Sequence, residues 1–226
     1  MTRLVLGLLH TAESHSARFD AILGEIAPAD IGWVHSVREG LLRQALGKAG
    51  TDRIAAGIAA VLNELRAQGA GQVLCTCSSI GGLAEQVGRQ IGLPTLRVDR
   101  PMAEAAVRAG GRILVAACLP STLEPTSGLL NEVAHAQQRR IDIETLLMES
   151  AWPLFQAGDE AGFSRQIAAI IREARPYPDT IVLAQASMAA VADLLKSLPV
   201  PVFSSPRLGA VEALRRLTSE RKERIA

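Results

Sequence analysis

Short apolar runs alternate with helical patterns along almost the whole of this chain. Leu4–Leu9 opens the series as a continuous apolar run, and Arg18–Ile26 then repeats its apolar residues at helical spacing. Strands that alternate with helices form parallel sheets, because a right-handed helical crossover returns the chain to the same end of the sheet. The sequence therefore predicts an α/β fold of parallel strands covered by helices.

The pattern predicts eight strands and at least nine helical stretches. The predicted strands are Leu4–Leu9, Ile31–Val37, Val73–Thr76, Thr95–Val98, Ile113–Cys118, Ile141–Leu147, Ile181–Gln185 and Val200–Ser204. The predicted helical stretches are Arg18–Ile26, Leu41–Ala45, 51–65, Ile80–Ile91, Met102–Ala109, Leu129–Val133, Phe163–Ile171, Met188–Leu195 and Leu208–Leu217.

An internal repeat divides these elements into two similar halves. Residues 73–78 (VLCTCS) align with 182–187 (VLAQAS), and residues 93–101 align with 198–206 through a shared Leu-Pro and a closing Pro. The alternative is chance similarity of two strand–helix–strand units, and the matched prolines favour a true repeat. Each half then has four strands, and two pseudo-symmetric lobes would turn their strand ends toward one ligand cleft.

The repeat also predicts where the lobes begin and end. The first lobe would comprise residues 1–100 plus 207–226, and the second lobe residues 101–206. Cys77 lies in the first lobe, and the Ala186-Ser187 turn lies in the second.

The stretch 72–82 (QVLCTCSSIGG) is the strongest candidate for a site. It places two cysteines where a predicted strand ends and a helix begins. Ligands of α/β sheets bind at this end of the strands, and the positive end of a helix stabilises a thiolate. Cys75 lies inside the apolar run and is interpreted as an ordinary core residue. Cys77 lies at the turn and is interpreted as functional.

Composition excludes several classes of function. The chain has 226 residues and a formal net charge of +1, which argues against nucleic acid and membrane surfaces as partners. Three cysteines form neither a disulfide framework nor a convincing zinc site, so no metal is expected. The apolar N-terminal run is short and is interrupted by polar residues, so no signal peptide is expected and the protein is predicted to be cytoplasmic.

The chain resembles the aspartate/glutamate/hydantoin racemase superfamily over nearly its whole length. The resemblance rests on four segments taken together: 73–82 (VLCTCSSIGG), 98–107 (VDRPMAEAAV), 111–126 (GRILVAACLPSTLEPT) and 181–188 (IVLAQASM). It implies a two-lobe, pseudo-symmetric α/β fold and a small acidic substrate between the lobes. It also implies chemistry without a metal or an organic cofactor.

The resemblance further implies a pair of catalytic cysteines, one from each lobe, on opposite sides of the α-carbon of the substrate. Cys77 matches the first, with Ser78 and Ser79 after it where Asn-Thr is usual. The second position is assigned to Ala186, which has no proton to exchange, and the hydroxyl of Ser187 is a poor replacement. The assignment therefore argues against racemisation by two thiols.

One activated thiol still allows several functions. As an acid or base, Cys77 could move a proton at the carbon α to a carboxylate, and as a nucleophile it could add to a double bond. The first hypothesis is an isomerase of the racemase type, with a single-cysteine decarboxylase or a cis–trans isomerase of a small dicarboxylate as alternatives. A non-catalytic protein that binds a small carboxylate is the alternative from another class.

Hydroxyl and imidazole groups near predicted strand ends complete the candidate site. Helix N-capping is the structural alternative for each serine, and the imidazole could either replace the missing acid/base or only bond to a loop. The predicted substrate-binding residues are Ser78, Ser79, Ser187, Thr11, His10, Ser121 and Thr122. Cys118 is interpreted as a core residue, and a homodimer or larger homo-oligomer is compatible with the composition.

Overall fold

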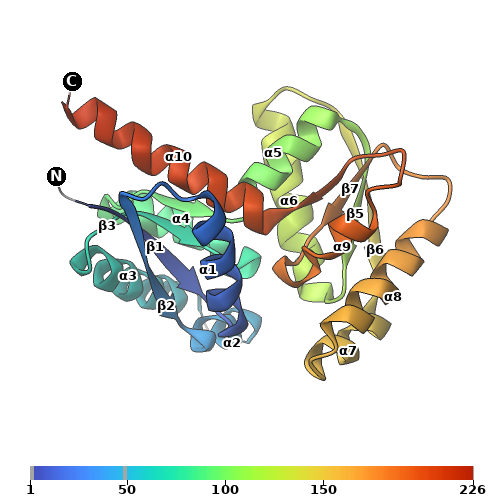
Figure 1. Ribbon diagram of the computed structural model, residues 1–226, viewed down its shortest axis with the longest axis horizontal. Coiled ribbons are helices and arrows are strands. Elements are labelled where there is room, and N and C mark those ends of the chain that lie inside the picture. The colour runs from blue at the N-terminus through green and yellow to red at the C-terminus, as the bar shows by residue number, and fades with distance from the viewer. Residues whose placement is uncertain (1–2, 48–49, 226) are drawn as a thin grey trace. The chain divides into compact units, whose positions relative to one another are not determined.

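The computed structural model describes residues 3–47 and 50–225, and within them eight strands form two parallel four-stranded sheets (Figure 1). The chain divides into two compact units, residues 1–98 with 206–226 and residues 99–205. The strand order is β2-β1-β3-β4 in the first unit and β6-β5-β7-β8 in the second. The two units therefore have the same topology, which confirms the predicted α/β fold with four parallel strands in each lobe.

The strands begin and end close to their predicted positions. They are β1 (Leu4–His10), β2 (Ile31–Val37), β3 (Ala70–Cys75), β4 (Thr95–Arg97), β5 (Gly111–Ala117), β6 (Ile141–Leu147), β7 (Thr180–Leu183) and β8 (Val202–Ser204). The α-helices are α1 (Ser14–Ile26), α2 (Glu39–Leu46), α3 (Thr51–Ala67), α4 (Ser78–Ile91), α5 (Arg100–Ala109), α6 (Pro120–Ala136), α7 (Trp152–Gln156), α8 (Glu160–Glu173), α9 (Val191–Leu194) and α10 (Ser205–Ile225). Two short 3-10 helices are η1 (Glu149–Ala151) and η2 (Ala186–Met188).

The largest differences from the predicted elements lie in the second unit. Helix α6 begins nine residues before the predicted Leu129, because Pro120 occupies the favourable first turn and the helix continues through Pro125. Helix α7 was not predicted, since its five residues are too few to show a period. The predicted helix Met188–Leu195 is divided into η2 and the four-residue α9.

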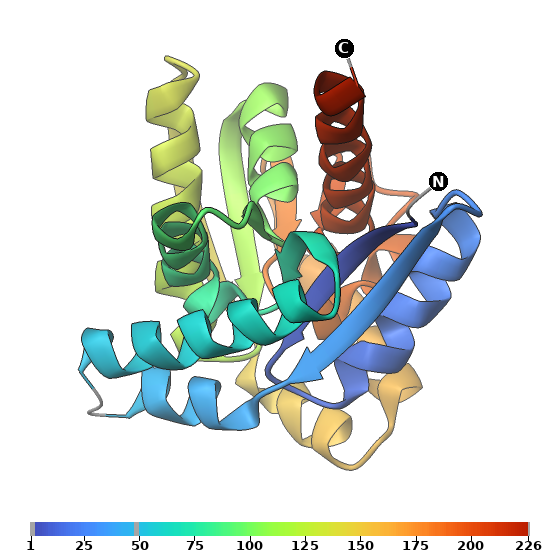
Figure 2. The ribbon, with the colours of Figure 1, turned by 90° about the vertical axis from the view of Figure 1, so that its left-hand side faces the viewer.

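Helices cover both faces of the first sheet (Figure 1, Figure 2). Side chains alternate along β3, so that Val73 and Cys75 pack with α3 and α4 while Leu74 packs with α1 and α10. Gly7 on β1 leaves space on the side of the sheet that α3 covers. An added Cβ would lie 3.1 Å from Ala70 and Val73 on β3 and 3.3 Å from Leu65 on α3. Helices thus cover both faces of the first sheet, which explains the continuous apolar run Leu4–Leu9 in β1.

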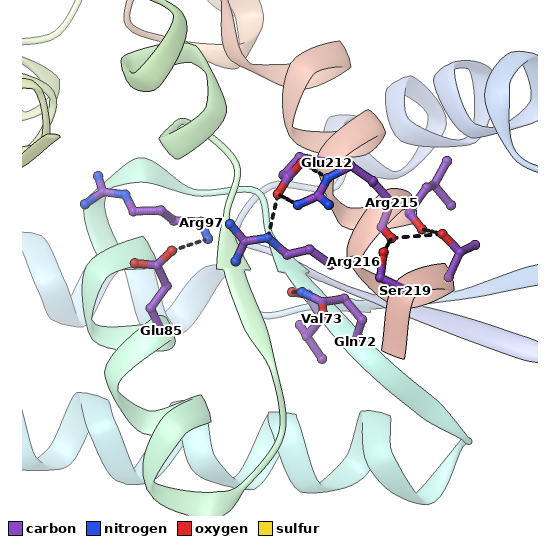
Figure 3. A network of polar contacts seen from close by, with 10 residues as sticks. Gln72, Val73, Glu85, Arg97, Glu212, Arg215, Arg216 and Ser219 are labelled. Carbon is purple, nitrogen blue, oxygen red and sulfur yellow. Dashed lines mark hydrogen bonds and ion pairs between the residues drawn. The ribbon is translucent and has the colours of Figure 1, made fainter. Parts of the chain in front are cut away.

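Helix α10 belongs to the first unit although it follows the whole of the second unit in the chain. Ala210, Ala213, Leu214 and Leu217 pack with β1, β3 and β4 in one apolar cluster. On the polar side of α10, Glu212 accepts hydrogen bonds from Arg215 at 2.7 and 2.8 Å and from Arg216 at 2.7 Å (Figure 3). These bonds, with that from Arg215 the largest cause, lower the pKa of Glu212 to about 2.

The second sheet has its own apolar core. Helices α8 and α9 pack on it through Phe163, Ile167, Ile171 and Val191, all of which are fully or almost fully buried. The ring of Phe163 lies 5.2 Å from that of Phe155 on α7. Each unit therefore buries an apolar core of its own.

Candidate functional site

Cys77 lies at the carboxyl end of the first sheet, between β3 and α4. Its backbone is extended, with φ −117° and ψ 116°, and it is the N-cap residue of α4. The residue is 8% exposed, whereas Cys75 is completely buried and directs its thiol toward the carbonyl of Cys77 at 3.7 Å. Both cysteines belong to the apolar cluster that packs with α3 and α4, Cys75 at the end of β3 and Cys77 at the strand-to-helix turn.

Ser78 and Ser79 form the first turn of α4. Neither is the N-cap residue, because Cys77 holds that position and its side chain makes no capping hydrogen bond. The first N–H groups of an α-helix have no partner within the helix, and together with the helix dipole they favour a negative charge. This turn accordingly combines a thiol, two hydroxyls and the positive end of a fourteen-residue helix.

Arg97, which sequence reasoning did not select, packs against the same turn. It ends β4, is 6% exposed, and its guanidinium Nη2 lies 3.4 Å from the carbonyl oxygen of Ser78. An added Cβ on Gly81 would lie 2.7 Å from Cβ of Arg97, so the glycine makes room for this side chain. The backbone N–H of Arg97 donates to Glu85 at 3.1 Å (Figure 3). A buried guanidinium therefore lies beside the first turn of α4.

His10 ends β1 and lies on the opposite face of the sheet from Cys77. It is completely buried, and both ring nitrogens have protein partners: Nδ1 lies 2.8 Å from Thr76 Oγ1, and Nε2 lies 2.8 Å from His35 Nδ1. Burial is the main cause that lowers the pKa of His10 to about 3, with His35 and His15 as lesser causes. His10 is thus a neutral ring inside a network, and its role as a substrate-binding group stays a prediction.

The network continues at both ends of His10. Beyond His35, its Nε2 lies 3.0 Å from Asp20 Oδ1, which also accepts a hydrogen bond from Trp33 Nε1 at 2.7 Å. The hydrogen bond from Trp33 is the largest cause that lowers the pKa of Asp20. At the other end, His15 Nδ1 lies 3.3 Å from Thr76 Oγ1.

His15 is a second residue that sequence reasoning missed. It is half-buried in the first turn of α1, and burial, followed by the charge of Arg18, lowers its pKa to about 4. One sequence signal could have identified His15. It lies five residues after His10, just beyond the polar segment that follows β1, and so near the same carboxyl end of the sheet.

The hydrogen-bond register corrects the alignment of the two halves. Thr76 N donates to Leu9 O in the first unit, and Ala184 N donates to Ala116 O in the second. Val73 N likewise donates to Pro94 O, and Ile181 N donates to Pro201 O. Residues 73–77 are therefore equivalent to 181–185, not to 182–186, and Pro94 is equivalent to Pro201 rather than to Pro199.

Gln185, not Ala186, consequently occupies the position of Cys77 in the second unit. Its backbone is also extended, with φ −109° and ψ 140°, and it is the N-cap residue of η2. Its side-chain Oε1 accepts a hydrogen bond from the backbone N–H of Cys118. The alignment of Cys77 with Ala186 was wrong because identical Val-Leu pairs occur one residue out of register in the two strands.

The structure places the other predicted site residues at the carboxyl ends of the strands of their own units. Thr11 directly follows β1 and is buried. Ser121 and Thr122 lie in the first turn of α6, the former exposed and the latter buried. Ser187 lies in η2, at the position equivalent to Ser79. The first unit thus brings Thr11 to the same sheet end as Ser78 and Ser79, and the second brings Ser121 and Thr122 to the same sheet end as Ser187.

Cys118 lies in the position of the second unit that is equivalent to Thr11. It is completely buried, and burial raises the pKa of its thiol to about 12. A thiol held in its neutral form suits a core residue, as predicted. Among the residues that the structure describes, no group of three or more His, Cys, Asp or Glu side chains could hold a metal ion, and no helix is long and apolar enough to cross a membrane.

Comparisons with known proteins agree with this architecture. A family model described as Asp/Glu/Hydantoin racemase matches residues 11–213. An aspartate racemase from Picrophilus torridus is similar in structure, with a TM-score of 0.72 and 13% identity over 95% of this chain and 94% of that one. A glutamate racemase from Thermus thermophilus, in complex with β-chloro-D-alanine, gives a TM-score of 0.71 and 15% identity over 97% and 82% of the two chains.

A structure with a different activity also shares the fold. A mutant of arylmalonate decarboxylase, in a form associated with sulfate, gives a TM-score of 0.60 and 18% identity over 95% of this chain and 93% of that one. No curated protein sequence matches the chain. The structural likenesses are all at low identity, so they establish the fold alone.

Proposed function

Because this chain belongs to the Asp/Glu/hydantoin racemase family, we propose that it is an enzyme that transfers a proton at the carbon α to a carboxylate of a small acid. Cys77 is the proposed acid/base. The observation that carries the proposal is the place of Cys77 directly after the carboxyl end of β3, where it is the N-cap residue of α4 and is 8% exposed.

The proton transfer uses the thiolate of Cys77. The thiolate takes the α-proton, so that the C–H bond breaks, an S–H bond forms, and the electron pair of the C–H bond moves into the carboxylate as an enediolate. Return of the proton from the thiol to the carbon reverses each of these changes. A cysteine suits both directions because its ordinary pKa lies closer to neutrality than that of a hydroxyl.

The negative charge on the carboxylate and the enediolate has partners in the same unit. The N–H groups of the first turn of α4 offer hydrogen-bond donors and the positive end of the helix dipole. Ser78, Ser79 and Thr11 are the proposed hydroxyl donors of this unit. The guanidinium of Arg97, close to Ser78, adds a positive charge to the surroundings of the site.

The second unit supplies no thiol at the equivalent position. The amide of Gln185 has no pKa in the range of proton transfer, so the second unit adds no acid/base to this position. This observation favours a second candidate function, decarboxylation. Loss of CO2 from a malonate-like acid leaves an enediolate that Cys77 alone can protonate, and a structural relative with decarboxylase in its name supports the same idea.

Proton exchange in heavy water tests the proposal. The protein is incubated with aspartate, glutamate, a hydantoin, maleate and malonates, and the α- and vinyl-proton signals are followed by NMR. Cys77→Ala should abolish exchange of at least one enantiomer or the formation of product, and Cys118→Ala, which removes a thiol outside the site, should leave both unchanged. Silence of the wild type across this panel, together with saturable binding by calorimetry, would favour a non-catalytic carboxylate-binding protein.

A further inference from the structure

A chain of hydrogen bonds leads from an exposed carboxylate to the residue that precedes Cys77. It runs from Asp20 through His35 and His10 to the hydroxyl of Thr76, with separations of 3.0, 2.8 and 2.8 Å, and then to His15 at 3.3 Å. The side chain of Asp20 is 55% exposed, whereas His10 is completely buried. Because each ring bonds to the next group in this series of hydrogen bonds, the position of the proton on one ring determines its position on the next.

The carboxylate of Asp20 fixes the direction of these hydrogen bonds. A carboxylate only accepts, so Nε2 of His35 must carry a proton, and with that single proton on the ring its Nδ1 accepts. His10 must then donate from Nε2 and accept on Nδ1. The opposite direction would set a lone pair of His35 against the carboxylate of Asp20.

The hydroxyl of Thr76 determines which nitrogen of His15 carries the proton. The hydroxyl of Thr76 has a single proton, and its acceptors are His10 Nδ1 at 2.8 Å and Leu9 O at 3.2 Å, so no second proton is left to donate to His15. The oxygen of Thr76 is then free to accept from His15, which must carry its proton on Nδ1. A neutral imidazole has one proton, so Nε2 of His15 is left with its lone pair.

This nitrogen differs from the other ring nitrogens of the network. Both nitrogens of His10 and both of His35 have partners, whereas His15 Nε2 has no hydrogen bond among residues 3–47 and 50–225. His15 is also only half-buried. The network therefore holds one half-buried imidazole in a single tautomer, with a proton-accepting nitrogen that the fold does not use.

His15 and Cys77 lie on opposite faces of one sheet end. Cys77 packs with the α3 and α4 side, and His15 lies on the α1 side, next to His10 with ring centroids 6.2 Å apart. Thr76 joins them, since it bonds to His15 and is the neighbour of Cys77 in the chain. A substrate bound over this end of the sheet would have one group on each side.

We propose that His15 Nε2 is the second acid/base of the Cys77 site, with Thr76, His10, His35 and Asp20 as the residues that fix its tautomer. The inference rests on the proposed function and assigns the missing partner of Cys77 to the same unit. One group removes the α-proton from one face of the carbon and the other group returns a proton to the opposite face. When His15 accepts, the C–H bond breaks, an N–H bond forms at Nε2, the electron pair enters the enediolate, and the S–H proton of Cys77 completes the reaction.

The charge balance of this step is consistent with the network. Protonated His15 keeps its Nδ1–H bond to Thr76, so no other proton has to move. Its pKa of about 4 describes the protein without substrate, and a bound carboxylate would raise it because the negative charge favours the imidazolium. Substrate would thus increase the basicity of His15 where it is needed.

The tautomer can be tested without any activity. In 15N-labelled wild-type protein at neutral pH, long-range proton–nitrogen spectra should show Nε2–H tautomers for His10 and His35 and an Nδ1–H tautomer for His15. The exposed His135, outside the network, serves as the reference. Thr76→Val should release His15 into a mixture of tautomers, and Thr76→Ser, which keeps the hydroxyl, should not. An Nε2–H tautomer for His15 in the wild type would overturn the inference.

The acid/base role is tested with separate enantiomers of any substrate that exchanges. Cys77→Ala should reduce the rate of exchange from one enantiomer at least a hundredfold, and His15→Asn should reduce the rate from its mirror image by the same factor. Asparagine at residue 15 can still donate to Thr76 in place of Nδ1 but lacks the basic nitrogen, and His135→Asn is the matched control. If His15→Asn exchanges both enantiomers like the wild type while Cys77→Ala is silent, the inference fails and the proposed function stands. If exchange does not depend on Cys77, the proposed function itself fails.

Discussion

Cys77 and Gln185 occupy the same position in their two sheets. Each is the second residue after the third strand of its unit, each has an extended backbone, and each is the N-cap residue of the following helix. A thiol in one unit is thus matched by an amide in the other. This relationship identifies residue 185, rather than residue 186, as the counterpart of Cys77 in the second unit.

A thiol at residue 185 should restore inversion of the α-carbon where the proposed acid/base His15 is absent. In Gln185→Cys made in the His15→Asn background we expect the rate of inversion to rise by about 100-fold over His15→Asn alone, since a general acid or base contributes on the order of 10²–10⁴ to such steps. Chiral chromatography of the product measures it. Ala186→Cys in the same background is the control one residue along the chain, and equal gains in the two variants would contradict the register.

The buried histidines should make the protein sensitive to mild acid. His10 and His15 have pKa values of about 3 and about 4 in the folded protein, against 6.5 for an ordinary histidine. Below pH 6.5 the unfolded chain binds more protons, so stability is lost as the pH falls from 6.5 toward 4. From pH 7 to pH 5 we expect a loss in the free energy of unfolding of about 2 kcal/mol from His10 and about 1 kcal/mol from the less buried His15.

Urea titrations at pH 7, 6 and 5 measure this loss. His15→Asn should reduce it by about 1 kcal/mol, because the substituted side chain takes up no proton in either state. His135→Asn, at an exposed position, should leave the difference between pH 7 and pH 5 unchanged. The same pH dependence in wild type and His15→Asn would show that His15 titrates normally in the folded protein.

Two glycines inside helices should respond to alanine in opposite ways. An added Cβ on Gly24 in α1 meets nothing within 4 Å, so Gly24→Ala should stabilise by about 0.5–1 kcal/mol. An added Cβ on Gly88 in α4 would lie 2.4 Å from Thr95 Oγ1 and 2.7 Å from Leu93 O, so Gly88→Ala should destabilise by about 1–3 kcal/mol. Urea unfolding of the two variants compares them, and stabilisation by both would show that α4 and β4 are packed less closely.

Cys118 should resist alkylation in the native protein. Burial raises the pKa of its thiol from 9.0 to about 12, so at pH 8 its thiolate fraction is about a thousandfold lower than that of an ordinary cysteine. Iodoacetamide labelling followed by mass spectrometry should leave Cys118 unmodified under native conditions and modify all three cysteines in urea. Native labelling of Cys118 at the rate of an unfolded thiol would contradict the buried position.

The fold was predictable from the sequence to a greater extent than the site. The alternation of apolar runs and helical patterns was sufficient for both sheets, because strands covered by helices on both faces, such as β1 and β5, are largely continuous apolar runs. Helix α6 was predicted too short, since Pro125 is a breaker in most helices but is accommodated in this one. Local patterns thus identify the elements better than their ends.

The site could be predicted only where one residue carried the signal. Cys77 was found because a thiol at a strand-to-helix turn is unusual by itself. His15 and Arg97 were missed because their importance comes from Thr76 and Ser78, residues distant in sequence that only the folded chain brings to them. The true partner of Cys77 in the repeat was missed for a similar reason: hydrogen-bond register, and not residue identity, decides which residues are equivalent.

The return of α10 to the first unit has a consequence for the synthesis of the protein. The apolar cluster on the α1 face of the first sheet includes Ala210, Ala213, Leu214 and Leu217, which a ribosome makes only after residues 99–205. The unit that is encoded in the middle of the chain can therefore complete its core before the unit that is encoded first. Until residue 217 leaves the exit tunnel, Leu6, Leu8 and Leu74 remain without part of their cover, and in this interval the nascent chain is most exposed to aggregation and to chaperones.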